Sequence, residues 1–242
     1  MKPPRIYPNL LQAVAQALEQ IFFELQPADK VVERTLRSDG RWGARDRRWV
    51  AEEIYSVVRD YGALCYLLGI EKAREQADLY ALVGAAQWLR TGGIPLQERW
   101  KQEWVEEFEE RWNALSEAEK LRLRYPAWLY DWAQEQIGAS YWAALAAALQ
   151  QPAPLILRVN RLKTTVEKAA AALQKLGISS QPVDGCADAL RLDERARLAD
   201  TEPFKKGWIE IQDAGSQRIA QALSPYLGAI VVDGCAGAGG KS

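Results

Sequence analysis

The chain has 242 residues, of which 48% are hydrophobic and 26% charged, with a formal net charge of -1. This balance is ordinary for globular proteins and argues against disorder over most of the length. A net charge this close to zero excludes a uniformly basic nucleic-acid coat, so any RNA binding has to use local patches.

Histidine is absent, which excludes Ser-His and Cys-His catalytic pairs and removes the commonest transition-metal ligand. Cys65, Cys186 and Cys235 form no C-x-x-C pair, so we expect no metal site. A sparse, odd cysteine count is typical of a reducing compartment. The sequence has neither a signal-peptide pattern at its start nor an apolar run long enough to span a membrane. We therefore expect a soluble, cytoplasmic monomer with no membrane partner.

Helical periodicity dominates residues 1–124, the first expected domain. Apolar side chains recur at three- and four-residue steps. The expected helices cover residues 9–25, 44–68, 76–89 and 96–114, with a short helix after Asp29 as its cap. The many tryptophans are expected to pack in cores; stacking on unpaired bases is the alternative.

Mixed α and β patterns follow residue 124. We expect a mixed subdomain over residues 125–212 and the start of a further domain over residues 213–242. Helices are expected over residues 140–149 and 166–176, the second capped by Thr164, with a helical turn near 197–204. Strands are expected over residues 155–160, 189–192 and 207–212. Asp213 should cap a helix that ends at Leu223, before a short buried strand over residues 230–233.

A glycine-rich loop after Asp233 is the strongest chemical signal, because a strand–glycine loop corner lets a ligand approach backbone amides closely. The dinucleotide pattern G-x-G-x-x-G fails, since its last position falls on Ser242. The phosphate-binding pattern G-x-x-x-x-G-K-[ST] needs its first glycine where Cys235 stands, one residue after Gly234.

The string from Asp233 to Lys241, DGCAGAGGK, closely resembles the D-x-C-A-x-P-G-G-K cofactor motif of RNA cytosine-5 methyltransferases of the NOL1/NOP2/Sun family. Ala238 replaces the usual proline, which gives the turn more backbone freedom without removing amide donors. By this resemblance, S-adenosyl-L-methionine is the cofactor. The residues expected to bind it are Cys235, Ala236, Gly237, Ala238, Gly239, Gly240 and Lys241.

Three further strings resemble the same family, in the order in which the family has them. PAWL begins at Pro126, LRVN begins at Leu157 and is followed by Lys163-Thr164, and GWIEIQDAGSQ begins at Gly207. The basic segment at Arg41 and the helix after it resemble the NusB-like RNA-binding domain of the bacterial Sun-type rRNA methyltransferases. The resemblance covers residues 125–242 and, more weakly, the helical front.

The resemblance implies an α+β fold that is mostly α. A NusB-like helical bundle (1–124) would precede a small mixed α/β RNA-binding subdomain (125–212) and then the first strand and loop of a Rossmann-like methyltransferase domain (213–242). The implied activity is methylation of cytosine C5 in RNA, expected to be 16S rRNA. In this family a cysteine thiolate adds to C6 of the base. The cysteines that catalyse the reaction lie downstream of the cofactor loop, so we expect no catalytic residue before Ser242 and an inactive fragment.

Two basic groups are candidates for contacts with RNA phosphates. One lies at a strand–helix corner and the other in the helical front. They comprise Arg158, Asn160, Arg161 and Lys163, and Arg45, Arg47 and Arg48. Solvated surface side chains are the alternative explanation for both groups.

Two other functions remain open from the sequence. The chain could be a non-catalytic RNA-binding or assembly module that uses only the helical and mixed parts. It could also be a phosphate-loop nucleotide-binding protein built on Gly239, Gly240, Lys241 and Ser242, despite the one-residue offset.

Overall fold

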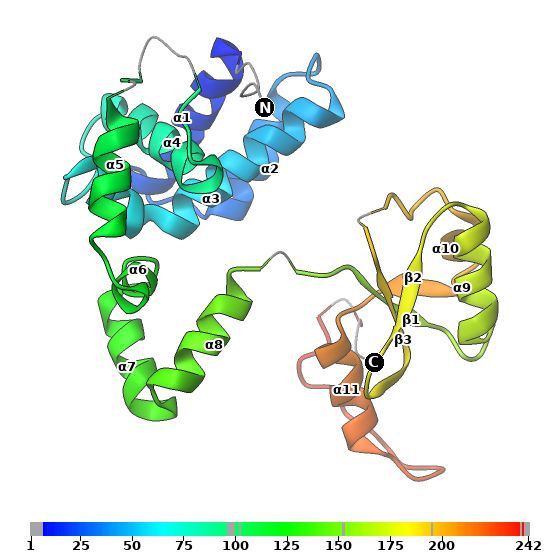
Figure 1. Cartoon of the computed structure of the whole chain (residues 1–242). Coiled ribbons are helices and arrows are strands. Elements are labelled where there is room, and N and C mark those ends of the chain that lie inside the picture. The colour runs from blue at the N-terminus through cyan, green and yellow to red at the C-terminus, as the bar shows by residue number, and fades with distance from the viewer. Residues whose placement is uncertain are drawn as a thin grey trace. The chain divides into compact units, whose positions relative to one another are not determined.

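The computed structural model describes residues 7–95, 100–101, 103–151, 153–194, 196–237 and 239. The chain forms two compact units, residues 1–150 and 151–242 (Figure 1). The first is helical and the second contains a small antiparallel sheet, which confirms the expected α+β, mostly α class. Contacts thus divide the chain between Gln150 and Gln151, inside the segment expected to form one mixed subdomain. The functional division after residues 124 and 212 stays a prediction.

The first unit is built around the long helix α3, which packs on α1, α2, α4 and α5. Its described helices are α1 (Pro8–Phe22), α2 (Ala28–Ser38), α3 (Ala44–Leu68), α4 (Gln76–Thr91), α5 (Trp104–Asn113), α6 (Glu117–Arg122), α7 (Ala127–Ile137) and α8 (Ala139–Leu149). Aliphatic side chains such as Val14, Ile54, Leu64 and Leu82 are fully buried in the main core. Burying each such side chain contributes about 1.5–3 kcal/mol, so this core holds α1, α3 and α4 together.

A buried charge joins α3 to α4. Glu53 is only 1% exposed and pairs with Arg90. Burial raises the pKa of Glu53, while the nearby Arg90 guanidinium opposes that rise. Removing Arg90 would leave a buried carboxylate without its partner, which destabilises the folded state. The ion pair therefore helps to hold α3 and α4 together.

Trp100 packs onto α4 from outside any helix. Its indole N–H donates to the main-chain oxygen of Tyr80 at 2.8 Å. A Cβ at Gly84 would lie 3.0 Å from the indole ring, so a glycine inside α4 makes room for the tryptophan. The predicted helix over residues 96–114 is therefore wrong at Trp100, since the observed helix begins at Trp104; residues 96–99 and 102 lie outside the described residues.

Helices α6, α7 and α8 form a separate small cluster in the first unit. Ser116 caps α6 by accepting from the amide of Glu119, whose carboxylate accepts from the Ser116 amide at 2.8 Å. Gly138, with φ of +83°, separates α7 from α8. The cluster core contains Tyr130, Ala133, Trp142 and Ala146. The Tyr125 hydroxyl donates to the main-chain oxygen of Ala146 at 3.1 Å, which ties the segment before α7 to α8.

The second unit contains a four-stranded sheet in the order β2-β3-β1-β4, with every neighbouring pair antiparallel. Its elements are β1 (Ile156–Val159), α9 (Val166–Lys175), β2 (Ser180–Val183), β3 (Cys186–Leu192), α10 (Glu202–Lys205), β4 (Ile209–Ile211) and α11 (Ala214–Leu223). Central strand β1 pairs Arg158 with Ala189 of β3 on one side and with Glu210 of β4 on the other. The strand–helix corner after β1 therefore lies beside β4.

Helices cover both faces of this sheet. One face packs against Ala169 and Leu173 of α9 through Leu157, Val159, Leu190, Leu192 and Ile209. The opposite face packs Ile156, Cys186 and Ala189 against Ala214 of α11. Alternating residues of β1 thus enter different cores, as the two-residue period of a strand requires.

The expected buried strand over residues 230–233 is wrong. The chain is neither a strand nor buried there: Ile230 is 94% exposed and Val232 is 87% exposed. A strand needs a neighbour to take its backbone hydrogen bonds, and the described sheet has none beside this segment. The first strand of a Rossmann-like domain, expected here, is therefore not formed.

Smaller differences concern helix ends. Leu25, expected on the first helix, follows α1 with φ of +54° and is 83% exposed. Asp29 lies in the first turn of α2 and makes no cap hydrogen bond, because Pro27 occupies the cap position. Thr165 rather than Thr164 caps α9, accepting from the Lys168 amide.

Candidate functional site

The glycine loop begins with a turn set by Asp233, whose side chain accepts from the amide of Cys235 at 3.0 Å. Gly237 and Gly239 have φ of +56° and +78°, a region that favours glycine. The amide of Gly239 donates to the main-chain oxygen of Ala236 at 2.8 Å, which folds the loop back on itself. Among the predicted cofactor residues, Ala238, Gly240 and Lys241 lie outside the described residues.

The described part of the loop has room for a ligand beside its backbone. A Cβ built on Gly234, Gly237 or Gly239 would meet nothing within 4 Å. Cys235 and Ala236 are exposed, so the loop presents main chain and small side chains to its surroundings. These features fit a cofactor that is held through backbone amides.

The helix before the loop is fixed to the sheet by its own side chains. Asp213 caps α11 by accepting from the amide of Gly215 at 2.9 Å. Gln217, 3% exposed, donates to the main-chain oxygens of Leu157 at 3.3 Å and Gln212 at 3.0 Å. Its amide oxygen lies 3.5 Å from the buried thiol of Cys186, within hydrogen-bond reach. The Gly207–Gln217 string therefore forms the joint between β1, β4 and α11.

The arginines of the predicted strand–helix corner are paired with acids. Arg158 on β1 lies 3.0 Å from Glu210 on β4, with a third of its side chain exposed. Arg161 lies 3.7 Å from Asp188 on β3. Both guanidiniums keep further donors, so each can still meet a phosphate.

Asn160 and Lys163 hold the corner together. The side-chain oxygen of Asn160 accepts from the amide of Leu162 at 3.1 Å, and the main-chain N–H of Asn160 donates to the main-chain oxygen of Trp208 at 2.8 Å. The Lys163 ammonium donates to the main-chain oxygen of Lys206 at 3.0 Å. Asn160 thus shapes the turn, and sequence reasoning missed that Lys206 and Trp208 belong to this site.

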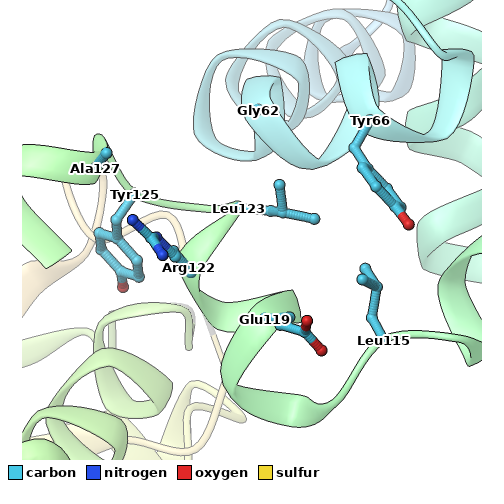
Figure 2. A pocket seen from close by; sticks show the side chains of 8 residues that line it. All are labelled: Gly62, Tyr66, Leu115, Glu119, Arg122, Leu123, Tyr125 and Ala127. Atoms are coloured by element: carbon cyan, nitrogen blue, oxygen red, sulfur yellow. The ribbon is translucent and has the colours of Figure 1, made fainter. Parts of the chain in front are cut away.

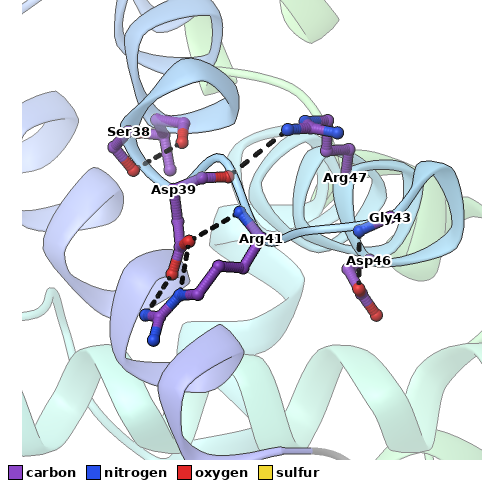
Figure 3. Close-up of polar contacts among 7 residues, drawn as sticks. Ser38, Asp39, Arg41, Gly43, Asp46 and Arg47 are labelled. Atoms are coloured by element: carbon purple, nitrogen blue, oxygen red, sulfur yellow. Dashed lines mark hydrogen bonds and ion pairs between the residues drawn. The ribbon is translucent and has the colours of Figure 1, made fainter.

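In the helical front, Arg47 has a structural role (Figure 3). Its guanidinium donates to the main-chain oxygens of Leu36 at 3.1 Å and Asp39 at 3.3 Å. It therefore satisfies carbonyls at the end of α2 that the helix itself leaves unpaired.

The neighbouring cations of the front are exposed. Arg48 pairs with Glu52 at 2.7 Å, whereas Arg45 is a solvent-facing side chain of α3. Arg41 bonds the carboxylate of Asp39 through two nitrogens, and these bonds lower the pKa of Asp39 to about 2 (Figure 3). The three predicted front residues thus lie in one helical turn, but Arg47 bonds main-chain oxygens, Arg48 pairs with Glu52 and Arg45 is exposed to solvent.

The tryptophans divide into packed and exposed side chains. Trp100 and Trp142 are each 4% exposed, and Trp104 and Trp112 pack against the main core, as expected. Trp128 and Trp132 on α7, by contrast, are 71% and 56% exposed. Core packing therefore does not account for the two tryptophans of α7.

A pocket of about 390 Å³ lies between α3 and the α6 region (Figure 2). Its lining is mostly apolar and comprises Gly62, Tyr66, Leu115, Glu119, Arg122, Leu123, Tyr125 and Ala127. The Glu119 carboxylate is engaged in capping α6, and Arg122 pairs with Asp131 at 3.5 Å. None of the residues predicted to bind cofactor or RNA lines this pocket.

Within the described residues, no group of three or more cysteine, aspartate or glutamate side chains is placed to hold a metal ion. Over the same residues, no helix has the length and apolar character needed to cross a membrane.

Comparison with known proteins identifies relatives for most of the chain. Residues 125–199 match the family described as methyltransferase RsmF/B-like, ferredoxin-like domain. Ribosomal RNA small subunit methyltransferase B of Citrobacter koseri is 35% identical over 129 residues, which cover 53% of this chain and 29% of that protein. The same-named protein of Escherichia coli (strain SMS-3-5 / SECEC) is 27% identical over 264 residues, covering 97% of this chain and 60% of that protein.

Among solved structures, that of PH0851 matches with a TM-score of 0.55 and 14% identity, covering 93% of this chain and 57% of that one. A likeness at this identity concerns the fold alone. The chain spans less than two thirds of the length of the curated relatives described above.

Proposed function

Because the chain belongs to the Sun/RsmB-type family, we propose that it is part of an enzyme that methylates C5 of a cytosine in 16S rRNA, with S-adenosyl-L-methionine as methyl donor. The observation that carries the proposal is the order of three parts in the chain. The family-matched segment (125–199) comes first, α11 is then fixed to its sheet by Gln217, and the glycine loop follows.

The glycine loop is proposed to bind the cofactor through residues 235–241. Its open turn at Gly237 and Gly239 supports this role, because a bound molecule can approach the backbone there without meeting a side chain. S-adenosyl-L-methionine would supply the methyl group, and Lys241 would add a positive charge near its carboxylate.

The nucleophile is proposed to lie outside this chain. Cys65 and Cys186 are buried, and burial raises the pKa of Cys65, which disfavours the reactive thiolate. Cys235 is exposed but lies within the proposed cofactor loop. This chain by itself is therefore proposed to be inactive.

Contacts with RNA are proposed for both basic groups, with different roles inside each. Arg158 and Arg161 keep guanidinium donors for phosphates, whereas the side-chain oxygen of Asn160 is already used to shape its turn. In the front, Arg45 and Arg48 face solvent, so they suit RNA better than Arg47 does.

The remaining proposals concern the domain organisation of the enzyme, its location and its oligomeric state. Residues 1–124 are proposed to form a NusB-like RNA-binding domain, and residues 213–242 to begin a Rossmann-like methyltransferase domain. The enzyme is proposed to act as a cytoplasmic monomer without a metal.

The test uses the full-length protein that carries this sequence and unmodified small-subunit rRNA. Methyl transfer and mass spectrometry of the product should reveal 5-methylcytosine. Gly237→Ala should weaken binding of S-adenosyl-L-methionine and slow methyl transfer, because a side chain at positive φ is strained. Gly228→Ala is the matched control, since Gly228 also has positive φ and open surroundings but lies before the loop.

Two results would contradict the proposal. RNA binding without any methyl transfer by the full-length protein would favour a non-catalytic module. Binding of ATP with magnesium in place of S-adenosyl-L-methionine would favour the nucleotide-binding alternative.

A further inference from the structure

Two turns meet at one edge of the second unit. The first, residues 161–163, follows β1, and the second, residues 206–208, leads into β4. The Lys163 ammonium donates a hydrogen bond to the main-chain oxygen of Lys206. The main-chain N–H of Asn160 donates to the main-chain oxygen of Trp208. These bonds fix the two turns, here called the paired turns, against each other.

The close fit at Gly207 adds a second constraint. Gly207 has φ of +64°, and a Cβ there would lie 2.7 Å from the Lys163 ammonium nitrogen. A glycine at this position therefore lets the lysine cross the second turn. The Lys163 ammonium thus occupies the space that a Cβ at position 207 would take, next to the main-chain oxygen of Lys206 that accepts its hydrogen bond.

Lys206 is held on the same surface by an aromatic ring. Its ammonium lies 5.3 Å from the centre of the Trp208 ring and 2.5 Å from a carboxylate oxygen of Glu202. An ammonium over an indole face is attracted by the ring quadrupole. Because an ammonium has three donors, both lysines keep donors that face solvent.

We infer that the paired turns bind the phosphodiester backbone of an unpaired RNA segment. Lys163 and Lys206 supply two exposed ammoniums, of which Lys206 is paired with Glu202. Arg161, paired with Asp188, adds a guanidinium in the first turn. Leu162, 97% exposed between Arg161 and Lys163, offers an apolar contact for a sugar or base. The choice of RNA rests on the proposed function, and the inference adds Lys206 and Trp208 to the residues that would bind it.

The exposed aromatic face of α7 is a poorer RNA surface. Trp128 and Trp132 are open to solvent, but the only charged residues between positions 127 and 149 are Asp131 and Glu135. Acidic groups repel phosphates, so exposure of aromatic rings does not by itself mark an RNA contact there.

The test measures binding of a fluorescent 12-nucleotide oligouridine to this chain at several salt concentrations. Lys163→Ala/Lys206→Ala should reduce affinity at low salt on the order of tenfold and make the plot of log affinity against log salt shallower by about 1.4, because two phosphate contacts are lost. Lys72→Ala/Lys175→Ala removes the same charge from exposed positions and should leave the slope unchanged. Trp208→Leu should weaken binding less than the double variant does, since it only releases Lys206.

Thermal unfolding of each variant separates a folding defect from lost contacts. If Lys163→Ala/Lys206→Ala unfolds early, Lys206→Gln replaces it and should make the slope shallower by about 0.7. A slope unchanged in folded variants, an equal effect of the control pair, or no binding by the unaltered chain would each overturn the inference. Methyl transfer by the unaltered full-length protein is a separate measurement. Failure of this inference can therefore be distinguished from failure of the proposed function.

Discussion

The side-chain amide nitrogen of Gln217 on α11 lies 3.3 Å from the main-chain oxygen of Leu157 on the central strand β1. It also lies 3.0 Å from the main-chain oxygen of Gln212, which follows β4. One buried side chain therefore joins the helix that precedes the glycine loop to two strands of the sheet.

Replacing Gln217 should loosen this joint. Gln217→Leu removes two hydrogen bonds between α11 and the sheet, which should cost about 0.5–1.5 kcal/mol each. Hydrogen–deuterium exchange should become faster in β1 and α11, while α3 and α4 keep their rates. Gln221→Leu on the exposed side of the same helix is the control. Equal exchange in both variants would show that Gln217 does not hold the joint.

Gly62 is predicted to tolerate no side chain. A Cβ there would lie 2.4 Å from the main-chain oxygen of Leu123, and backbone cannot move aside as a flexible side chain can. Gly62→Ala should destabilise the first unit by about 1–3 kcal/mol, as overpacking typically does. Gly93→Ala, where a Cβ would meet nothing within 4 Å, should leave the melting temperature nearly unchanged. Similar melting temperatures for the two variants would contradict the close approach.

Among the arginines of the helical front, Arg47 should contribute to folding stability and Arg45 to RNA binding. Arg47→Met removes donors from the main-chain oxygens of Leu36 and Asp39 and should cost about 1 kcal/mol in urea unfolding. Arg45→Met should leave that stability unchanged and lower RNA affinity at low salt. The reverse pattern would show that the assigned roles are exchanged.

Asp39 should make the free energy of unfolding depend on pH in the acidic range. Its pKa in the folded protein is about 2, below the ordinary 3.8, because Arg41 bonds the charged carboxylate. A lowered pKa contributes stability that is fully present above 3.8 and is lost as the pH falls from 3.8 towards 2. Asp39→Asn should therefore be less stable than the unaltered chain at neutral pH, and the gap should close at acidic pH. A gap that stays constant across this range would exclude the ion pair as its cause.

Local patterns in the sequence predicted elements whose signals are complete within one segment. The helix over residues 44–68 was predicted at the bounds it has, since its apolar stripe runs from Trp49 to Leu68. The helix ends at Gly69, which has φ of +68°. Asp213 was predicted as a cap and makes that bond. Both depend on residues that are close in sequence.

Features that depend on distant partners were missed. Strand β2 carries Pro182 and has a largely exposed pattern, so only its pairing with β3 makes it a strand. Conversely, Ile230 and Val232 read as a buried strand but have no pairing partner among the described residues. At the candidate RNA site, the sequence predicted Lys163 but not Lys206 or Trp208, because 43 positions along the chain separate the two turns that Lys163 joins.

The exposed segment from Ile230 to Val232 also affects how the purified chain will behave. A short, β-prone apolar stretch that is open to solvent is a site for strand pairing between molecules. Concentrated solutions should scatter more light with time. Ile230→Lys should slow that growth and ease crystallisation and spectroscopy of the chain.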